Sequence, residues 1–180
     1  MIKFCAKIFS ITGLVFLLGT LFSGLVMTGT RPDLISALAG GLLFGAIMTL
    51  IMGTLHFLKA RKAAAGDARG DIYATTQVRE FESGLEYDRL FTAIAHYLKE
   101  TAGFTLTESD HDAGRLAART PFNFITFGSK VTVQLEKRTA GPVLVKIVSK
   151  PLVITTLADY GENLKIVKAL EEHLRAGERG

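Results

Sequence analysis

One short motif offers the residue types of a polar site: Asp159, Glu162 and Asn163 lie within five consecutive residues, DYGEN. The carboxylate of Asp159 and the amide of Asn163 could hold a metal ion or a polar substrate. The same pattern also begins helices, with Asp159 accepting a backbone N–H in the first turn and Glu162 reaching back to the cap. Because an apolar pattern of helical period follows directly, we interpret Asp159 and Glu162 as a helix cap.

The densest group of acidic and histidine residues is Glu108, Asp110, His111 and Asp112. A divalent cation is one interpretation, but a calcium loop spreads its ligands over about 12 residues. A solvated hairpin tip fits the spacing better. The other histidines are scattered, without an HxxxH or HExxH pair for zinc. The sequence therefore predicts no metal site.

Nucleotide and nucleophilic chemistry find no support in the motifs. The chain contains neither G-x-G-x-x-G nor G-x-x-x-x-G-K, so it lacks a phosphate-binding loop. Its single cysteine, Cys5, lies near the N-terminus, away from any base that could activate it. We expect no catalytic residue and no cofactor, which predicts a non-enzymatic protein.

The stretch 121–128, PFNFITFG, places Phe122, Phe124 and Phe127 in a connection between two expected strands. Large apolar side chains are costly to expose, so burial in the core beneath a helix end is the favoured interpretation. The alternative is a contact surface for a membrane or a partner.

The net charge of +4 is unevenly distributed along the 180 residues. Residues 1–70 carry +5 and residues 71–180 carry −1. The basic excess therefore flanks apolar segments, and the polar part has no surplus of Lys and Arg to neutralise phosphates. We expect no nucleic-acid partner.

Two apolar segments precede the polar part. Residues 8–28 contain no charged side chain, and residues 34–58 contain only His56 as a titratable group. Helices of these lengths match a hydrocarbon core of about 30 Å. A buried helix pair is disfavoured because nothing later in the chain is apolar enough to enclose it. A signal peptide is disfavoured for the first segment because a second span follows at once. We expect residues 1–58 to form a transmembrane hairpin in the lipid bilayer.

The basic residues near these spans are concentrated at the ends away from the short connection, residues 29–33: Lys3, Lys7, Lys59, Arg61 and Lys62. Only Arg31 lies in the connection itself. The positive-inside bias therefore predicts a two-span protein of a bacterial inner membrane with both termini in the cytoplasm.

Small residues recur at intervals of four in both spans: Gly19 and Ser23 in the first, and Ala37, Gly41 and Gly45 in the second. Such faces let helices approach closely in lipid. The favoured interpretation is that they pack the two spans of one chain together. A homo-oligomer or docking on another membrane subunit is the alternative.

Residues 59–71 are rich in Ala, Gly and charged residues and predict a linker before a domain at 72–180. In this domain, alternating patterns predict strands near 75–81, 104–107, 116–120, 131–136 and 143–149, and helical spacing predicts helices near 89–101 and 159–175. The order β-α-β-β-β-β-α with short turns predicts an α+β fold, in which helices cover one face of a mainly antiparallel sheet.

This order resembles the TATA-binding-protein-like or helix-grip type of α+β fold. The residues Asp159, Gly161 and Asn163 are also similar to the D-x-G-x-N sequence that begins the second helix of many small, mostly uncharacterised bacterial domains. The resemblance covers roughly residues 75–175. It implies an architecture and no activity.

Together these features predict a membrane-anchored, non-enzymatic interaction or accessory protein that presents a cytoplasmic α+β domain to a protein partner. Two alternatives stay open. One is a domain that binds lipid or a small ligand on the concave face of its sheet, and the other is a subunit of a transporter or other membrane complex that docks through the hairpin.

The charge asymmetry makes the topology testable. A reporter that is active only outside the cytoplasm should work when inserted at Thr30 and fail when fused after Gly180, because the positive-inside bias retains the basic ends. The reverse pattern of reporter activity would contradict the topology.

Overall fold

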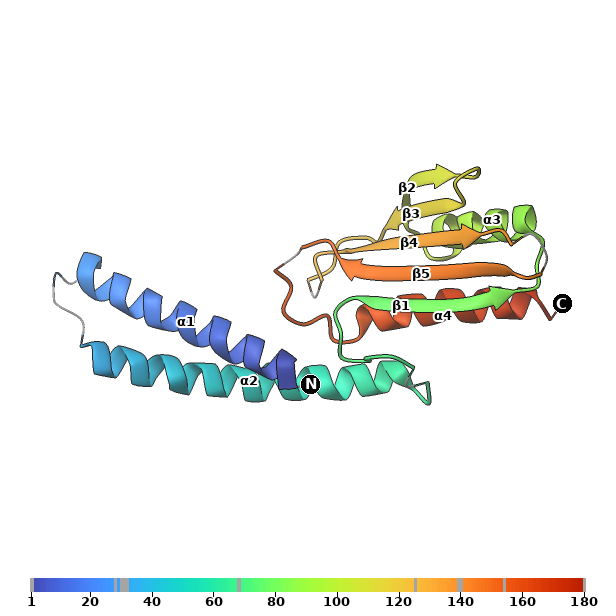
Figure 1. Ribbon diagram of the computed structural model, residues 1–180. Coiled ribbons are helices and arrows are strands. Elements are labelled where there is room, and N and C mark those ends of the chain that lie inside the picture. Colours follow the sequence, from blue (N-terminus) through green and yellow to red (C-terminus); the bar gives the residue numbers. More distant parts are fainter. Residues whose placement is uncertain are drawn as a thin grey trace. The chain divides into compact units, whose positions relative to one another are not determined.

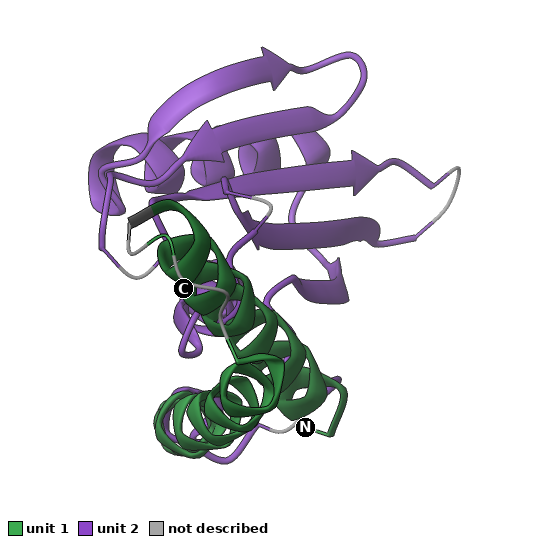
Figure 2. Cartoon of the chain, turned by 90° about the vertical axis from the view of Figure 1, so that its left-hand side faces the viewer, with its two compact units in different colours: residues 1–59 green, residues 60–180 purple. Residues whose placement is uncertain are grey.

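The computed structural model describes residues 2–27, 29, 33–67, 69–124, 126–138, 141–153 and 155–179. The chain forms two compact units, residues 1–59 and residues 60–180, which Figure 2 colours green and purple.

The first unit consists of two long helices, α1 (Ile2–Met27) and most of α2 (Leu34–Ala64) (Figure 1). Both are long and apolar enough to cross a membrane. Only 6% of the most apolar stretch of α1 and 17% of that of α2 is buried, so neither helix is mostly buried within this chain. Most of the connection between them, including Thr30 and Arg31, lies outside the described residues.

The two helices run antiparallel and approach each other at glycines. A Cβ atom added at Gly41 would lie 2.9 Å from the carbonyl oxygen of Gly13, and one added at Gly45 would lie 2.9 Å from that of Phe9. Ala37, on the same face of α2, is almost fully buried. The small-residue face expected on the second span therefore packs within the chain, through the close backbone approach that lipid-embedded helices use.

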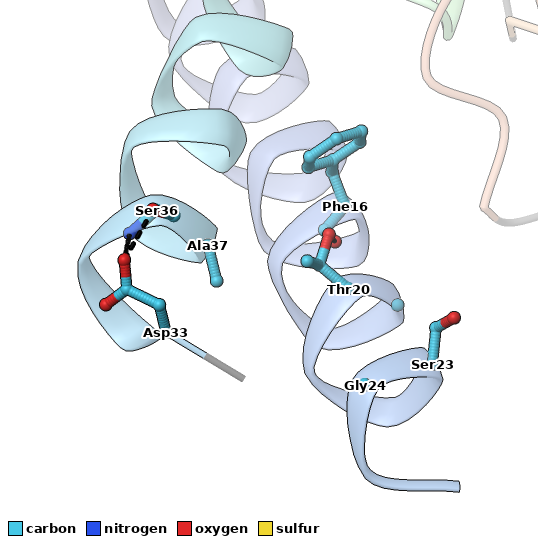
Figure 3. Close-up of a pocket in the computed structure, with 8 residues that line it drawn as sticks. Phe16, Thr20, Ser23, Gly24, Asp33, Ser36 and Ala37 are labelled. Atoms are coloured by element: carbon cyan, nitrogen blue, oxygen red, sulfur yellow. Dashed lines mark hydrogen bonds between the residues drawn. The ribbon is translucent and has the colours of Figure 1, made fainter. Parts of the chain in front are cut away.

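The partner face on the first span is not the expected one. Gly19 has no neighbour within 4 Å of an added Cβ, and Ser23 is exposed. Ser23 lines a pocket of about 610 Å³ together with Ser36 and Ala37 on the opposite helix. Figure 3 labels these residues on the two helices. Gly13 makes the contact with α2 that was expected of Gly19 and Ser23, because the two helices touch where their backbones can approach most closely.

In its described residues, the second unit contains five strands and two further helices (Figure 1). The strands are β1 (Gln77–Ser83), β2 (Thr105–Asp110), β3 (Arg115–Arg119), β4 (Ser129–Glu136) and β5 (Val143–Pro151). The helices are α3 (Tyr87–His96), which continues into a π-helical turn, η1 (Tyr97–Thr101), and α4 (Glu162–Gly177). Gly103, at φ +66°, follows η1 and ends this helical segment. It lets the N–H of Phe104 donate to the carbonyl of Leu98 at 2.8 Å.

The strands form one antiparallel sheet in the order β1-β5-β4-β3-β2. Alternate residues of β1, β4 and β5 are buried, and these side chains form one core with α3 and α4. The two helices thus cover one face of the sheet and leave the other open. The predicted α+β class and the order β-α-β-β-β-β-α are confirmed.

Residues 60–71, expected as a linker, belong to the second unit. Helix α2 continues to Ala64, and Ala63 and Ala64 join the core of this unit. The ammonium group of Lys168 on α4 donates to the carbonyls of Ala63 and Ala64, at 3.2 and 2.8 Å. A cation thus satisfies carbonyls that the end of α2 leaves free.

The hairpin contact is tested at Gly41, with Gly19 as the matched control. Gly41→Ile drives a branched side chain into the Gly13 backbone and should destabilise the helix pair by about 1–3 kcal/mol, whereas Gly19→Ile meets open space. A Gly53→Cys background supplies the readout, because a Cβ there lies 3.7 Å from the sulfur of Cys5. We expect Gly41→Ile, and not Gly19→Ile, to slow formation of the Cys5–position 53 disulfide. Equal rates would contradict the packing.

Candidate functional site

The connection between β3 and β4 carries an exposed cluster of aromatic side chains. Phe122, Phe124 and Phe127 are 63%, 89% and 48% exposed. The ring of Phe122 lies 5.3 Å from that of Phe124 and 5.8 Å from that of Phe127, measured between centroids. The favoured prediction that these residues are buried in the core is wrong, because all three rings are exposed in a connection that extends beyond the ends of β3 and β4. We call residues 121–128 the aromatic loop.

Local hydrogen bonds hold the aromatic loop in shape. Its ends are joined where Thr120 N donates to the carbonyl of Ser129 at 2.9 Å and Ser129 N donates to the Thr120 hydroxyl at 2.8 Å. Within it, the side-chain oxygen of Asn123 accepts from Thr126 N at 2.7 Å and from the Thr126 hydroxyl at 3.1 Å. The polar residues thus turn inward while the phenylalanines stay at the surface. Ile125 lies outside the described residues.

The segment after β5 adds apolar surface beside the aromatic loop. Leu152 N donates to the carbonyl of Gly128 at 3.0 Å, and a Cβ added at Gly128 would meet the Leu152 side chain. Leu152 and Val153 are themselves partly exposed. Two loops at the same end of the sheet therefore present one apolar patch.

Three basic residues lie side by side at this end of the sheet. Lys130 on β4 pairs in register with Arg119 on β3 and with Lys150 on β5. All three belong to the open face, because their strand neighbours Ala118, Val131 and Ser149 point into the core. Directly opposed like charges destabilise a sheet, so nothing in the fold itself favours this row. We call Arg119, Lys130 and Lys150 the basic row.

The charges at the other end of the open face are paired. Arg115 lies 3.2 Å from Glu108, Arg138 lies 2.7 Å from Glu82, and Lys146 also pairs with Glu80. In the described part of the chain, by contrast, no acidic side chain forms an ion pair with the basic row. The unbalanced positive charge is therefore confined to the end that carries the aromatic loop.

The DYGEN motif forms a buried structural junction. One carboxylate oxygen of Asp159 accepts from Gly161 N at 3.2 Å, and the other accepts from Asn163 N at 3.0 Å. The Asn163 amide also donates to Asp159 and to the carbonyl of Thr75, both at 3.0 Å, and accepts from the Ser149 hydroxyl at 2.6 Å. Asp159 thus binds N–H groups at the start of α4, and the motif joins that helix to β5 and to the segment before β1.

Glu162 does not reach back to the cap. Its carboxylate accepts a hydrogen bond from Lys165 at 2.6 Å, one turn further along α4. Helix α4 starts at Glu162 itself, after Gly161 at φ +80°, so Glu162 is the first helical residue, two positions before the one from which a capping-box carboxylate reaches back. This half of the predicted cap is wrong.

The second unit also holds a cluster of buried charges. Arg79 on β1 and Glu171 on α4 each have side chains only 4% exposed. Arg69 donates to both Glu171 oxygens, at 3.1 and 2.9 Å, and to Asp67 at 2.8 and 2.7 Å. Arg79 donates to the carbonyl of Arg69 at 2.7 Å, and Arg175 donates to Glu171 at 2.9 Å. These charges stabilise one another and tie residues 67–69 to β1 and α4.

The hydrogen bonds from Arg69 hold the pKa of the Asp67 carboxyl well below its usual value. A carboxylate favoured in the folded state stabilises the fold above its ordinary pKa of about 4. That contribution is lost as the pH falls through the lowered value, so the cluster is fully formed at neutral pH.

The acidic and histidine group is a solvated hairpin tip, as expected. Asp112 is fully exposed, and His111 is half-exposed, with its ring 3.0 Å from an Asp88 oxygen. A second hollow, of about 570 Å³, is lined by His96 and His173 on α3 and α4 and is open to solvent. Among the described residues, no group of three or more His, Cys, Asp or Glu side chains is placed to hold a metal ion.

Comparisons with known proteins add little to this geometry. No protein-family model matches the chain, and no curated protein matches it. Among solved structures, it is similar to one described as the crystal structure of Ara h 8.0201, with 13% identity over 58% of this chain and 95% of that chain. The TM-score is 0.35, and at that level the likeness supports no statement about this chain.

Sequence reasoning missed the basic row and the buried charge cluster. The alternation of β1 could have located Arg79, because it is in phase with Phe81 on the buried face. The basic row had no comparable signal, since its members become neighbours only through strand register.

The Asp159 junction yields a stability prediction. Asp159→Ala leaves two buried N–H groups without an acceptor and should cost about 1–3 kcal/mol. Asp159→Ser should recover only part of this, because one hydroxyl replaces two carboxylate oxygens. Urea unfolding followed by tyrosine fluorescence suits the test, since the four tyrosines all lie in residues 73–160. Glu162→Ala is the control and should change stability by less than about 0.5 kcal/mol. Unchanged stability in Asp159→Ala would contradict the structural role.

Proposed function

We propose that this chain is a membrane-anchored, non-enzymatic interaction protein of a bacterial inner membrane. In this proposal α1 and α2 span the bilayer, both termini lie in the cytoplasm, and the α+β unit is presented there to a protein partner. One observation carries the proposal. The same chain contains two helices with exposed apolar surfaces and a compact unit with its own core.

The exposed apolar surface of the helices supports the anchor. Large side chains stand out along both of them, among them Leu14, Phe22 and Leu25 on α1 and Ile35 and Leu50 on α2. Water disfavours each square ångström of such surface by about 25 cal/mol, whereas lipid chains cover it without that cost. The basic residues at the ends away from the connection support the cytoplasmic orientation.

The open face of the sheet supports a protein partner. Its middle is a cross-strand row of small and apolar side chains, Val78, Val148 and Thr132, paired in register. Val78 is 44% exposed. Ion pairs such as Lys146 with Glu80 flank this row. An apolar centre with a polar rim is the usual composition of a protein interface.

The aromatic loop favours a second candidate function, contact of the domain with lipid. Binding of a small ligand between the sheet and the helices is disfavoured. The described side chains there, such as Leu90, Ile94 and Leu164, are fully buried and fill the space.

Site-specific photo-crosslinking in cells tests the proposal on the full chain. A photoreactive amino acid at Val78 should give an adduct of discrete mass with a protein partner, and Val148 should give the same adduct because the two residues are in register. Asp112, fully exposed on the β2–β3 turn, is the matched control and should give none. If neither position on the open face forms an adduct, the partner proposal is contradicted.

A further inference from the structure

We infer that the aromatic loop and the basic row together form a docking surface for an anionic lipid bilayer. Phe122, Phe124 and Phe127 would insert into the membrane interface, and Arg119, Lys130 and Lys150 would contact the lipid phosphates. This inference rests on the proposed function in one respect, because the bilayer it uses is the one that α1 and α2 span.

The charge distribution is the first argument. On the open face, Arg115 and Lys146 pair with acidic residues of the edge strands, and only the basic row is left without such partners among the described residues. Residues 113–135 contain no Asp or Glu at all, and the first acidic residue after Glu136 is Asp159. A positive surface next to apolar side chains is complementary to lipid headgroups with negative charge.

The shape of the apolar patch is the second argument. Phe124 is the most exposed large apolar side chain in the described part of the chain, at 89%, and it stands at the tip of a loop rather than in a groove. The hydrogen bonds of Thr120, Asn123 and Ser129 hold the loop in this shape. A protruding aromatic tip fits the membrane interface, where a phenylalanine ring can bury without a matching pocket.

Attachment of the domain to the bilayer is the third argument. A domain joined to two membrane-spanning helices is confined near the lipid surface, so a weak contact is populated through its high effective concentration. Three aromatic rings and three cations would bind a bilayer only weakly from free solution. In a domain already attached to the bilayer, they are sufficient to keep the aromatic loop docked.

The absence of tryptophan from the chain allows a direct test. Single-tryptophan variants of the full chain are reconstituted in nanodiscs of phosphatidylcholine with brominated acyl chains, with or without phosphatidylglycerol. Phe124→Trp reports on the aromatic loop. Leu42→Trp, on an exposed position of α2, reports on the anchor, and Asp112→Trp, at the β2–β3 turn, is the matched soluble control.

We expect the brominated acyl chains to quench the tryptophan fluorescence of Phe124→Trp only when phosphatidylglycerol is present. High salt should reverse this quenching, because it screens the attraction between the basic row and the anionic lipid. Leu42→Trp should be quenched in both lipid mixtures, and Asp112→Trp in neither. Adding Lys130→Gln and Lys150→Gln to Phe124→Trp should weaken docking roughly fivefold for each charge removed. Arg138→Gln with Lys146→Gln removes the same charge from paired positions and should have a smaller effect.

The outcomes separate the two proposals. If Leu42→Trp is quenched while Phe124→Trp remains open to iodide and is not quenched by bromine, the docking surface is overturned and the anchor stands. If Leu42→Trp is not quenched, the anchor fails and docking fails with it. Quenching of Phe124→Trp that is equal without phosphatidylglycerol overturns recognition of anionic lipid. Protection from iodide without bromine quenching indicates a protein contact and also overturns the inference.

Discussion

Coverage of the sheet on one face only is the constraint on which the α+β unit depends. Because successive side chains of a strand point to opposite faces, α3 and α4 can bury only one half of each strand. The other half has to meet water or a partner. At one end this face is balanced by ion pairs such as Arg115 with Glu108, and at the other it is left positive beside the aromatic loop. Our proposals for the unit rest on that asymmetry.

The buried face is itself not purely apolar, and its polar members connect distant segments. Arg79 and Ser149 lie on this face with Val145 and Ile147, yet each has partners. Arg79 binds the backbone at Arg69, and Ser149 binds Asn163 at the start of α4. A buried polar group without partners would be costly, so these bonds hold residues 67–75 and the α4 start to the sheet. The buried polar residues thus organise the fold.

The two exposed apolar surfaces of the chain have different physical characters. On α1 and α2 the apolar side chains lie all around the helices. The two helices pack at Gly13 and Gly41, so the outer surface of each helix faces away from the other. In the α+β unit the apolar surface is a small tip next to cations. The first suits the hydrocarbon interior of a bilayer and the second suits its charged interface. Our proposals assign both to the same membrane, with the open sheet face left for a protein.

The sequence by itself determined the two apolar helices, the order of strands and helices and the α+β class, because helix length and the periods of 3.6 and 2.0 residues are local properties. It located Asp159 at a helix start for the same reason. Only the tertiary structure decided that Gly13 rather than Gly19 faces Gly41, that residues 60–71 join the domain, and that Phe122, Phe124 and Phe127 are exposed. It alone brought Arg119, Lys130 and Lys150 into one row. Each of these depends on neighbours distant in sequence, which the local pattern of residues does not encode.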